Sequence, residues 1–378
     1  MSWYLRMKRF VNAEKRMNSI KVVEVRMNGM QVGRLALTPE GLCAFEYSME
    51  FFSHGFSISP FELPLRTGVM IAKPRPFNGG FGVFDDCLPD GWGALVLDRY
   101  LQKQGINPRR LTLLDRLSLV GSNGRGALEF YPDRSVMNDT EYTDFECLAA
   151  AAERIFNSDD YHGDGIDEFM HRGGSPGGAR PKIFTEYENK EWLVKFRAKY
   201  DSENIGAEEY RYSLLAKRCG VDMPPTRLFE NKYFGVERFD RYEHRKLHVV
   251  SVAGLLGADY RVPSIDYTHI FQAASVLTRS IKELWKIYRL MVFNYLIGNK
   301  DDHAKNFSFI YADDTWRFAP AYDLLPSDGI NGYRTTSIND SIEPTEDDLI
   351  AVASRAGLDK KQANEIFEQM MRIVRDER

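Results

Sequence analysis

The chain has 378 residues, of which 43% are apolar and 28% are charged, and its formal net charge is -4. This composition predicts a soluble globular protein of two or three domains with a substantial core. The net charge argues against nucleic-acid binding through bulk positive charge, although a local basic patch is compatible with it.

The absence of targeting signals and the spacing of the cysteines indicate which kind of protein this is. No apolar run approaches the roughly 18 residues that a membrane-spanning helix needs, so no membrane contact is expected. Residues 1–16 are basic and lack the apolar region of a signal peptide, and we expect a disordered extension before Met17, or less simply a partner-binding arm. The cysteines Cys43, Cys87, Cys147 and Cys219 form no Cys-x-x-Cys pair, which disfavours a zinc site or a disulfide framework and favours a reducing cytoplasm.

Three strand-like runs open the chain, at Ser19–Arg26, Gln31–Leu37 and Leu42–Tyr47. Asn28-Gly29 separates the first two, and Asn-Gly is a strong hairpin signal. An antiparallel meander is therefore expected. Gly79–Phe84 then predicts a turn and a short strand.

The next stretch predicts two helices and a strand. Asp90 is a candidate N-cap for a helix that reaches Gln104, and a second helix is expected over Arg110–Leu119, followed by a strand at Ala127–Tyr131. This region is locally basic, which indicates a solvated face or, as an alternative, a contact with protein or DNA; the residues are Arg109, Arg110, Arg116 and Arg125.

A helix through about Phe156 is predicted by a capping box of Thr143 and Glu146. The polar stretch 157–172 is expected to be mobile. The segment Gly173–Lys182, with the sequence GGSPGGARPK, follows it. Four glycines in six residues allow the backbone to approach phosphate closely, but a plain turn has the same composition.

Lys195 lies inside the apolar strand predicted over Glu191–Phe196. A buried lysine needs an anionic partner, whereas an edge-strand lysine would reach solvent, and both alternatives are open. A helix over Ala207–Cys219 carries Glu208 and Glu209 in its first turn, and either glutamate is a candidate partner for Lys195. A hairpin of Thr226–Glu230 and Tyr233–Arg238 follows.

The most informative stretch is Asn299–Asp323, which comes after a strongly periodic helix predicted over Thr278–Asn299. Asp301 is followed five residues later by Asn306, then by a hairpin and by Asp323. Protein kinases use this order for the catalytic base and the two magnesium ligands. The simpler interpretation is an Asp- and Asn-rich loop beside an ordinary hairpin. The preceding order of glycine loop, lysine strand and glutamate helix favours the kinase interpretation.

These elements resemble the HipA family, the serine/threonine kinases of bacterial toxin–antitoxin modules. The resemblance spans about Leu88 to Ser327, and the opening meander also fits it. It is carried by the motifs LPDGWG (Leu88–Gly93), SPGGARPK (Ser175–Lys182), WLVKF around Lys195, VERFDR (Val236–Arg241), IGNKDDHAKNFS (Ile297–Ser308) and YDLLPS (Tyr322–Ser327). It implies an α+β, bilobal protein-kinase-like fold with a mainly antiparallel N-terminal subdomain and a helical C-terminal lobe. The implied domains are residues 17–131, the N-terminal subdomain; 132–240, the N-lobe with the glycine-rich loop; and 241–378, the helical C-lobe.

The resemblance also implies site residues. Asp301 would be the catalytic base, with the neighbouring Asp302 as the weaker choice. Asn306 and Asp323 would hold Mg²⁺. The remaining candidates would bind ATP or regulate the site: Lys195 at the phosphates, Gly177 and Gly178 in the glycine loop, Glu237 and Phe239 beside the adenine, and Ser175 as an inactivating autophosphorylation site.

The function implied is an ATP- and Mg²⁺-dependent protein kinase that inhibits growth. Its partners would be a HipB-like DNA-binding antitoxin, DNA only indirectly through that antitoxin, and a protein substrate, for which an aminoacyl-tRNA synthetase is a family precedent. Two alternatives are a small-molecule kinase and an inactive kinase-like component of a DNA-bound repressor complex.

Overall fold

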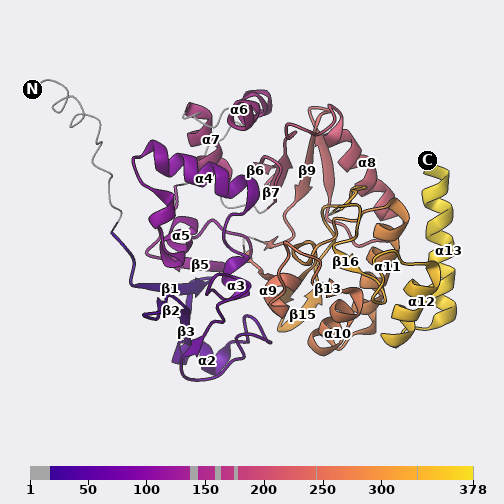
Figure 1. Cartoon of the computed structure of the whole chain (residues 1–378), viewed down its shortest axis with the longest axis horizontal. Helices are drawn as coiled ribbons and strands as arrows, with labels where there is room; N and C mark the ends of the chain where they lie inside the picture. Colours follow the sequence, from indigo (N-terminus) through magenta and orange to yellow (C-terminus); the bar gives the residue numbers. More distant parts are fainter. Residues whose placement is uncertain are drawn as a thin grey trace, which may run out of the picture.

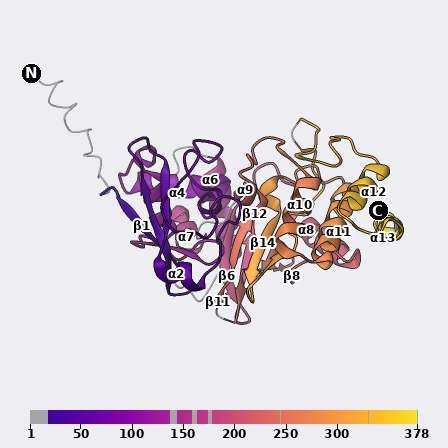
Figure 2. The same ribbon diagram turned by 90° about the horizontal axis from the view of Figure 1, so that it is seen from below.

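The computed structural model of the chain describes residues 18–136, 144–157, 163–173, 178–243, 245–329 and 331–377, so the extension expected at residues 1–16 lies outside them. It is an α+β protein in which the N-terminal sheet lies at one end and the C-terminal helices lie at the other (Figures 1 and 2). The predicted α+β class is confirmed. None of the helices in the described part of the chain combines the length and hydrophobicity that a membrane crossing requires.

A five-stranded antiparallel sheet with the order β4-β3-β2-β1-β5 forms the N-terminal end. Its strands are β1 (Val22–Met27), β2 (Met30–Leu37), β3 (Cys43–Tyr47), β4 (Met70–Ile71) and β5 (Leu128–Tyr131), with the short helix α2 (Met49–His54) after β3. Asn28 and Gly29 adopt positive φ angles of 48° and 84° in the β1–β2 turn, as the Asn-Gly signal predicts. The expected meander is confirmed.

The strand expected within Gly79–Phe84 is wrong, because Gly82–Asp85 forms the short helix α3. A close backbone approach explains the difference. A Cβ atom built on Gly82 would lie 2.5 Å from the carbonyl oxygen of Gly254, which belongs to helix α9 (Val252–Leu256). The apolar residues of α3 therefore pack against α9 rather than extending as a strand.

A second core joins the N-terminal region to the sheet that follows. Helices α4 (Gly91–Lys103), α6 (Phe145–Asn157) and α7 (Asp164–Gly173) surround Trp92, whose ring lies 5.0 Å from those of Phe156 and Phe169. The stretch 157–172, expected to be mobile, contains most of helix α7, and Ile166 and Phe169 lie on its buried face. Thr143 of the predicted capping box lies outside the described residues.

The four-stranded antiparallel sheet β6-β7-β9-β8 lies beside these helices. It comprises β6 (Lys182–Tyr187), β7 (Lys190–Lys195), β8 (Thr226–Phe229) and β9 (Tyr233–Glu237), with helix α8 (Ile205–Arg218) between β7 and β8. The predicted strand around Lys195, the predicted helix and the predicted hairpin are all present. The remaining helices of the N-terminal half are η1 (Pro108–Arg110) and α5 (Leu113–Val120), which together replace the single helix predicted over Arg110–Leu119.

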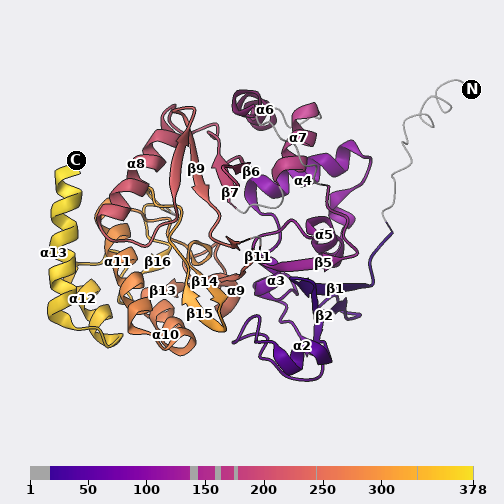
Figure 3. The ribbon, with the colours of Figure 1, turned by 180° about the vertical axis from the view of Figure 1, so that it is seen from behind.

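Helices α10 (Tyr267–Thr278), α11 (Ile281–Ile297), α12 (Glu346–Arg355) and α13 (Lys360–Glu377) form the C-terminal end, farthest from β1–β3 (Figure 3). The long predicted helix over Thr278–Asn299 is α11. It starts later because Arg279 adopts a left-handed conformation that ends α10, and it stops at Gly298, which has a φ of 73°.

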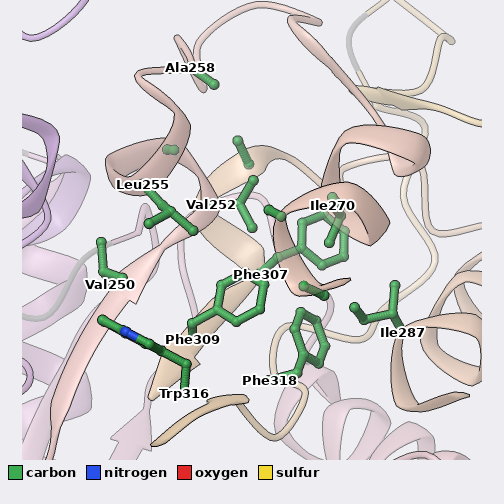
Figure 4. Packing of buried hydrophobic residues seen from close by; sticks show 14 of the residues in the cluster. Val250, Val252, Leu255, Ala258, Ile270, Ile287, Phe307, Phe309, Trp316 and Phe318 are labelled. Carbon is green, nitrogen blue, oxygen red and sulfur yellow. The ribbon is translucent and has the colours of Figure 1, made fainter. Parts of the chain in front are cut away.

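The predicted hairpin after Asn306 is formed by β14 (Ser308–Ala312) and β15 (Thr315–Phe318), and β12 (His248–Ser251) pairs with β14. Small strand pairs complete the region: β10 (Arg241–Tyr242) with β11 (Arg245–Lys246), and β13 (Ile265–Asp266) with β16 (Thr336–Ser337). Figure 4 shows Phe307, Phe309 and Phe318 buried together against Ile270 and Ile287. Phe307 directly follows Asn306, so the loop that carries the candidate base is anchored in this core.

The chain that follows Asp323 returns along the same loop. Lys300 donates its amide to the carbonyl of Ser327 at 3.2 Å, and Thr335 donates its amide to the carbonyl of Lys300 at 3.0 Å. Farther on, Asp266 at the start of α10 accepts hydrogen bonds from the hydroxyl of Ser337 at 2.6 Å and the amide of Asp340 at 2.9 Å.

Candidate active site

Lys195 lies in the interior of the four-stranded sheet, because β7 pairs with β6 on one side and β9 on the other. Its ammonium group donates a 2.8 Å hydrogen bond to Oε2 of Glu209 and also contacts Oδ1 of Asp323. Burial disfavours the charged form, but the two carboxylates outweigh burial and raise the pKa of Lys195. The edge-strand alternative is therefore excluded, and Glu209 rather than Glu208 is the partner.

Asp323 adopts a left-handed backbone conformation, with φ of 56°. The side-chain amide of Asn299 donates to its carbonyl oxygen at 3.3 Å. Burial opposes ionisation of its carboxyl group, yet the charges of Lys195 and Lys182 hold its pKa below the usual range. The Asp323 side chain is 39% exposed, so a ligand can reach this carboxylate.

Asp301 and Asn306 are held in one loop. The side-chain amide of Asn306 donates to the carbonyl of Asp301 at 2.9 Å, and Asn299 Oδ1 accepts the amide of Asp301 at 3.2 Å. Desolvation raises the pKa of the exposed Asp301, and the nearby charge of Asp323 adds to it, while His303 has the opposite effect. A partly desolvated carboxylate with a raised pKa has the properties of a general base.

Asp302, the alternative candidate, has a different environment. It is buried, and its Oδ2 accepts a hydrogen bond of 2.9 Å from the hydroxyl of Tyr267 and lies 3.3 Å from Nη1 of Arg334. Burial raises the pKa of Asp302 to about 7, although the charge of Arg334 opposes this. Its Oδ1 has no hydrogen-bond partner among the described residues. The Asp302 carboxylate faces the interior, away from the solvent that bathes Asp301.

A second lysine accompanies Lys195. Lys182 is its partner across the β6–β7 ladder and is 5% exposed. Burial lowers the pKa of Lys182 to about 8, although Asp323 opposes this. Beside it, Arg180 pairs with both carboxylate oxygens of Asp201 at 2.8 and 2.9 Å. This concentration of cations suits a polyanionic ligand.

The two residues predicted beside an adenine ring lie at the end of β9. Glu237 accepts two hydrogen bonds of 2.8 Å from Lys190, and the ring of Phe239 stacks on Tyr322 with 5.8 Å between centroids. Because Tyr322 precedes Asp323, the Phe239–Tyr322 pair borders the site. Arg125 donates a 3.0 Å hydrogen bond to the Tyr322 hydroxyl, so this arginine is not part of a solvated basic face.

The VERFDR motif connects the sheet to the turn 121–126. Asp240 accepts hydrogen bonds from Arg238 at 2.8 Å, from Arg241 at 2.9 Å and from the amide of Gly126 at 2.7 Å. Burial opposes its ionisation, but the arginines outweigh burial and lower the pKa of Asp240. The motif therefore stabilises the junction between the N-terminal region and the site.

Asp90 occupies the N-cap position of α4 as predicted, but its side chain does not cap that helix. Its Oδ1 instead accepts a hydrogen bond from the amide of Gly178, and its Oδ2 lies 3.1 Å from Nζ of Lys305. The other glycine candidate, Gly177, and the candidate serine, Ser175, lie outside the described residues.

The donor set agrees with a magnesium–nucleotide complex. Among the described residues, no group of three or more His, Cys, Asp or Glu side chains is placed to hold a metal. Asn306 and Asp323 offer hard oxygen donors, and Mg²⁺ needs few protein ligands when phosphates and waters supply the others. Lys182 and Lys195 would supply the positive charge that bound phosphates require.

Several residues of the site escape sequence reasoning. Lys182, Lys305 and Arg334 are single cations whose partners lie far along the chain, and Lys305 pairs with Asp90 across 215 positions. The apolar residues that follow Lys182 in β6 were a usable signal, because they predict a buried lysine in the same way as those around Lys195.

Comparison with known proteins places these observations in a family. The model of the HipA-like C-terminal domain matches residues 174–377, and that of the HipA N-terminal domain matches residues 23–131. The chain belongs to the HipA-like family.

Individual relatives are distant. The chain is 26% identical to Y4dM of Sinorhizobium fredii, a candidate kinase by its name, over 91% of this chain and 88% of that protein. It is 23% identical to the serine/threonine-protein kinase toxin HipA of Shewanella oneidensis, over 85% and 79% of the two chains. Kinase is therefore the coarse functional class to which these similarities assign the HipA-like chain.

The fold agrees with a solved structure. HipA in the Shewanella oneidensis complex of HipA, HipB and operator DNA superimposes with a TM-score of 0.69 at 20% identity, covering 93% of this chain and 88% of that one. The bilobal HipA-like fold predicted from the motifs is confirmed by this match.

Proposed function

We propose that this HipA-like chain is an ATP- and Mg²⁺-dependent serine/threonine protein kinase. The observation that carries the proposal is the contact of Lys195, from the sheet, with both Glu209 and Asp323, which follows the loop of Asp301 and Asn306. A kinase site brings four kinds of group together: the phosphate-binding lysine, its glutamate partner, the catalytic base and the metal ligands. It joins residues that lie up to 128 positions apart in sequence.

The residues then have separate roles. Asp301 accepts the proton of the substrate hydroxyl, and its raised pKa strengthens it as a base. Lys195 binds the phosphates, while Gly177 and Gly178 let the backbone of the glycine loop approach them closely. Asn306 and Asp323 would hold Mg²⁺, which neutralises phosphate charge when it is bound. Glu237 and Phe239 border the adenine.

Phosphoryl transfer from labelled ATP tests the proposal. The purified chain and its Asp301→Asn variant are incubated with Mg-ATP and host lysate, and labelled proteins are identified by mass spectrometry. A protein labelled on serine or threonine only by the parent chain supports the proposal, and an aminoacyl-tRNA synthetase is the first candidate to examine. Phosphoryl transfer only to purified metabolites would instead indicate a small-molecule kinase. A lack of ATP turnover would indicate an inactive kinase-like component of a DNA-bound repressor complex.

Ser175 is proposed as a site of inactivating autophosphorylation. Its neighbours include four glycines, which can change conformation at little steric cost. A phosphate there adds about −1.5 to −2 charges, which would repel ATP phosphates or pair with arginine. Mass spectrometry after incubation with Mg-ATP should find phosphate on Ser175 in the parent and little in Asp301→Asn. A phosphorylated chain that retains full activity would contradict the switch, leaving Ser175 as an ordinary turn residue.

A HipB-like antitoxin is the proposed partner, since the structurally similar HipA occurs in a complex with HipB and operator DNA. DNA contact would then be indirect, in agreement with the net charge of -4. A cytoplasmic location is part of the proposal, because the proposed protein substrates would be cytoplasmic and the cysteine spacing disfavours a disulfide framework. Co-expression with a candidate antitoxin tests the partner: the two should co-purify, and operator DNA should be retained by the complex and not by the kinase alone.

A further inference from the structure

The turn Asp90–Trp92, here called the Asp90 turn, forms hydrogen bonds with both the amide and the carbonyl group of Gly178. The Asp90 carboxylate accepts the amide hydrogen of Gly178, and the amide of Trp92 donates to its carbonyl oxygen at 3.0 Å. Between them, Gly91 has φ of 46°, and a Cβ atom there would lie 2.6 Å from the same carbonyl oxygen. Both polar groups of the Gly178 backbone are thus bound by one short turn from the N-terminal region.

Gly178 in turn lies against the inner lysine of the site. A Cβ atom built on Gly178 would lie 2.6 Å from Nζ of Lys182, so the ammonium group occupies the space that the missing side chain leaves. Lys182 feels the charges of both Asp323 and Asp90. The position of Gly178 therefore limits where this buried cation can lie.

The same carboxylate reaches the loop of the candidate base. Oδ2 of Asp90 lies 3.1 Å from Nζ of Lys305, the residue before Asn306, and Asp85 lies 3.3 Å from the same ammonium group. Burial opposes ionisation of Asp90, but Lys305 and the Gly178 amide hold its pKa below the usual value. Asp90 is thus charged at neutral pH and bridges the glycine loop to the Asp301 loop.

We propose that Asp90 is a positioning residue for phosphoryl transfer, through which the N-terminal region holds Gly178 and Lys182 in register with the loop of Asp301 and Asn306. The proposal rests on the kinase function proposed above. It explains why this motif carries an acid followed by glycine: the acid binds two elements at once, and glycine alone permits the approach. The Asp90 turn would affect the reaction by positioning the groups that bind ATP, without contacting the reacting atoms itself.

Graded variants test this. Asp90→Ala removes both contacts, Asp90→Asn keeps an acceptor for Gly178 but removes the charge opposite Lys305, and Gly91→Ala displaces Gly178 without altering Asp90. Asp98→Ala is the control, since Asp98 lies on helix α4, which follows Asp90, and forms a separate, part-exposed pair with Arg116 at 3.1 Å. Hydrogen exchange of peptides that contain the Gly178 amide, and KM for ATP and kcat, are measured on the full chain.

We expect exchange at Gly178 to accelerate and KM for ATP to rise about 10- to 100-fold in Asp90→Ala, the effect of losing hydrogen bonds to a charged group. A smaller change in kcat is expected. Asp90→Asn should fall between this variant and the parent, Gly91→Ala should resemble Asp90→Ala, and Asp98→Ala should match the parent. If Asp90→Ala does not fold, the results for Asp90→Asn and Gly91→Ala test the proposal instead.

Unchanged exchange and unchanged KM in these variants would overturn the proposal, as would a loss confined to kcat. A parent chain that neither binds nor turns over ATP would refute the kinase function instead. The exchange comparison needs no nucleotide and would still decide whether the Asp90 turn holds Gly178.

Discussion

The hydroxyl of Tyr267 donates a 2.9 Å hydrogen bond to Oδ2 of Asp302, so the second carboxylate of the Asp-Asp pair is committed to the interior. Asp301 remains exposed to substrate. We therefore expect Asp301→Asn to lower phosphoryl transfer about 10²- to 10⁴-fold, the usual cost of losing a general base, while ATP binding persists. Asp302→Asn retains an acceptor for the Tyr267 hydroxyl, so its rate of phosphoryl transfer should fall much less. Steady-state rates and ATP titrations of both variants check this, and the reverse ranking would assign the base to Asp302.

Asp302 also predicts a dependence of stability on pH. The pKa of Asp302 in the folded chain, about 7, lies above the ordinary value of 3.8, so between these pH values the folded chain keeps a proton that the unfolded chain releases. The contribution to stability is full below about pH 4 and is lost as pH rises to about 7. Asp302→Asn cannot ionise, so its free energy of unfolding relative to the parent should increase over this range, by up to about 4 kcal/mol at 1.36 kcal/mol per pKa unit.

Urea denaturation of parent and Asp302→Asn at pH 4, 5.5 and 7.5 measures this difference. Other titrating groups, such as the buried His248, affect both chains equally and cancel. Parallel pH profiles for the two chains would show that Asp302 has an ordinary pKa in the folded state.

Asp323→Ala should weaken Mg²⁺-dependent ATP binding more than Asn306→Ala. The carboxylate contributes charge to a Mg²⁺ contact, which an amide cannot. Removing it also deprives the buried ammonium group of Lys195 of one of its two carboxylates. Titration of ATP with and without Mg²⁺ on both variants separates these effects. Parent-like Mg-ATP affinity in Asp323→Ala would remove Asp323 from the site.

Two adjacent glutamates of α8 provide a matched comparison. Glu209 is buried and binds Lys195, whereas Glu208 accepts a hydrogen bond of 2.7 Å from Ser202 at the surface. We expect Glu209→Gln to lower kcat/KM for ATP about 10- to 100-fold, as loss of a charged hydrogen bond costs about 1.5–3 kcal/mol. Glu208→Gln should retain the parent value. Equal kinetics in the two variants would show that the Lys195–Glu209 pair does not contribute to the reaction.

Asp240→Ala should destabilise the fold strongly. It leaves the buried Arg238 and the largely buried Arg241 without their shared carboxylate, and breaking a buried ion pair costs about 3–5 kcal/mol. Asp313→Ala is the control, because the Asp313 side chain is 80% exposed and its pair with Arg317 contributes at most about 1 kcal/mol. Urea denaturation of both variants measures the difference. A loss no larger than that of the control would show that the arginines find other partners.

Local signals in the sequence predicted much of the fold. Asn28-Gly29 specifies its hairpin through backbone geometry alone, and the apolar periodicity of α11 identifies the helix that leads to Asp301. Helix α7 was missed although Ile166, Phe169 and Met170 have helical spacing, because charged residues and Gly165 dilute that pattern. Its burial depends on α4, which lies about 70 residues earlier and which no local window contains.

For the candidate site, the sequence indicated residues that share one segment but not pairs that join distant segments. Spacing within the Asn299–Asp323 stretch indicated Asp301, Asn306 and Asp323, since those residues share one segment. It did not indicate that Asp302 pairs with Arg334 or that Asp90 meets Lys305, because these pairs form only when separate elements pack together. An isolated Asp before a helix reads as a cap, and only tertiary structure shows that its side chain points elsewhere.

The return of the chain along the Asp301 loop has a mechanical consequence. In many kinases the stretch that follows the last metal-binding Asp is an activation loop that orders and disorders to switch the enzyme. Here Ser327, Thr335 and Ser337 attach the described part of that stretch to Lys300 and Asp266. Swinging it outward would break several backbone hydrogen bonds, each contributing about 0.5–1.5 kcal/mol. The helical half of the site is thus preassembled, and on–off control would fall to the opposite side, where Gly178 meets the N-terminal region.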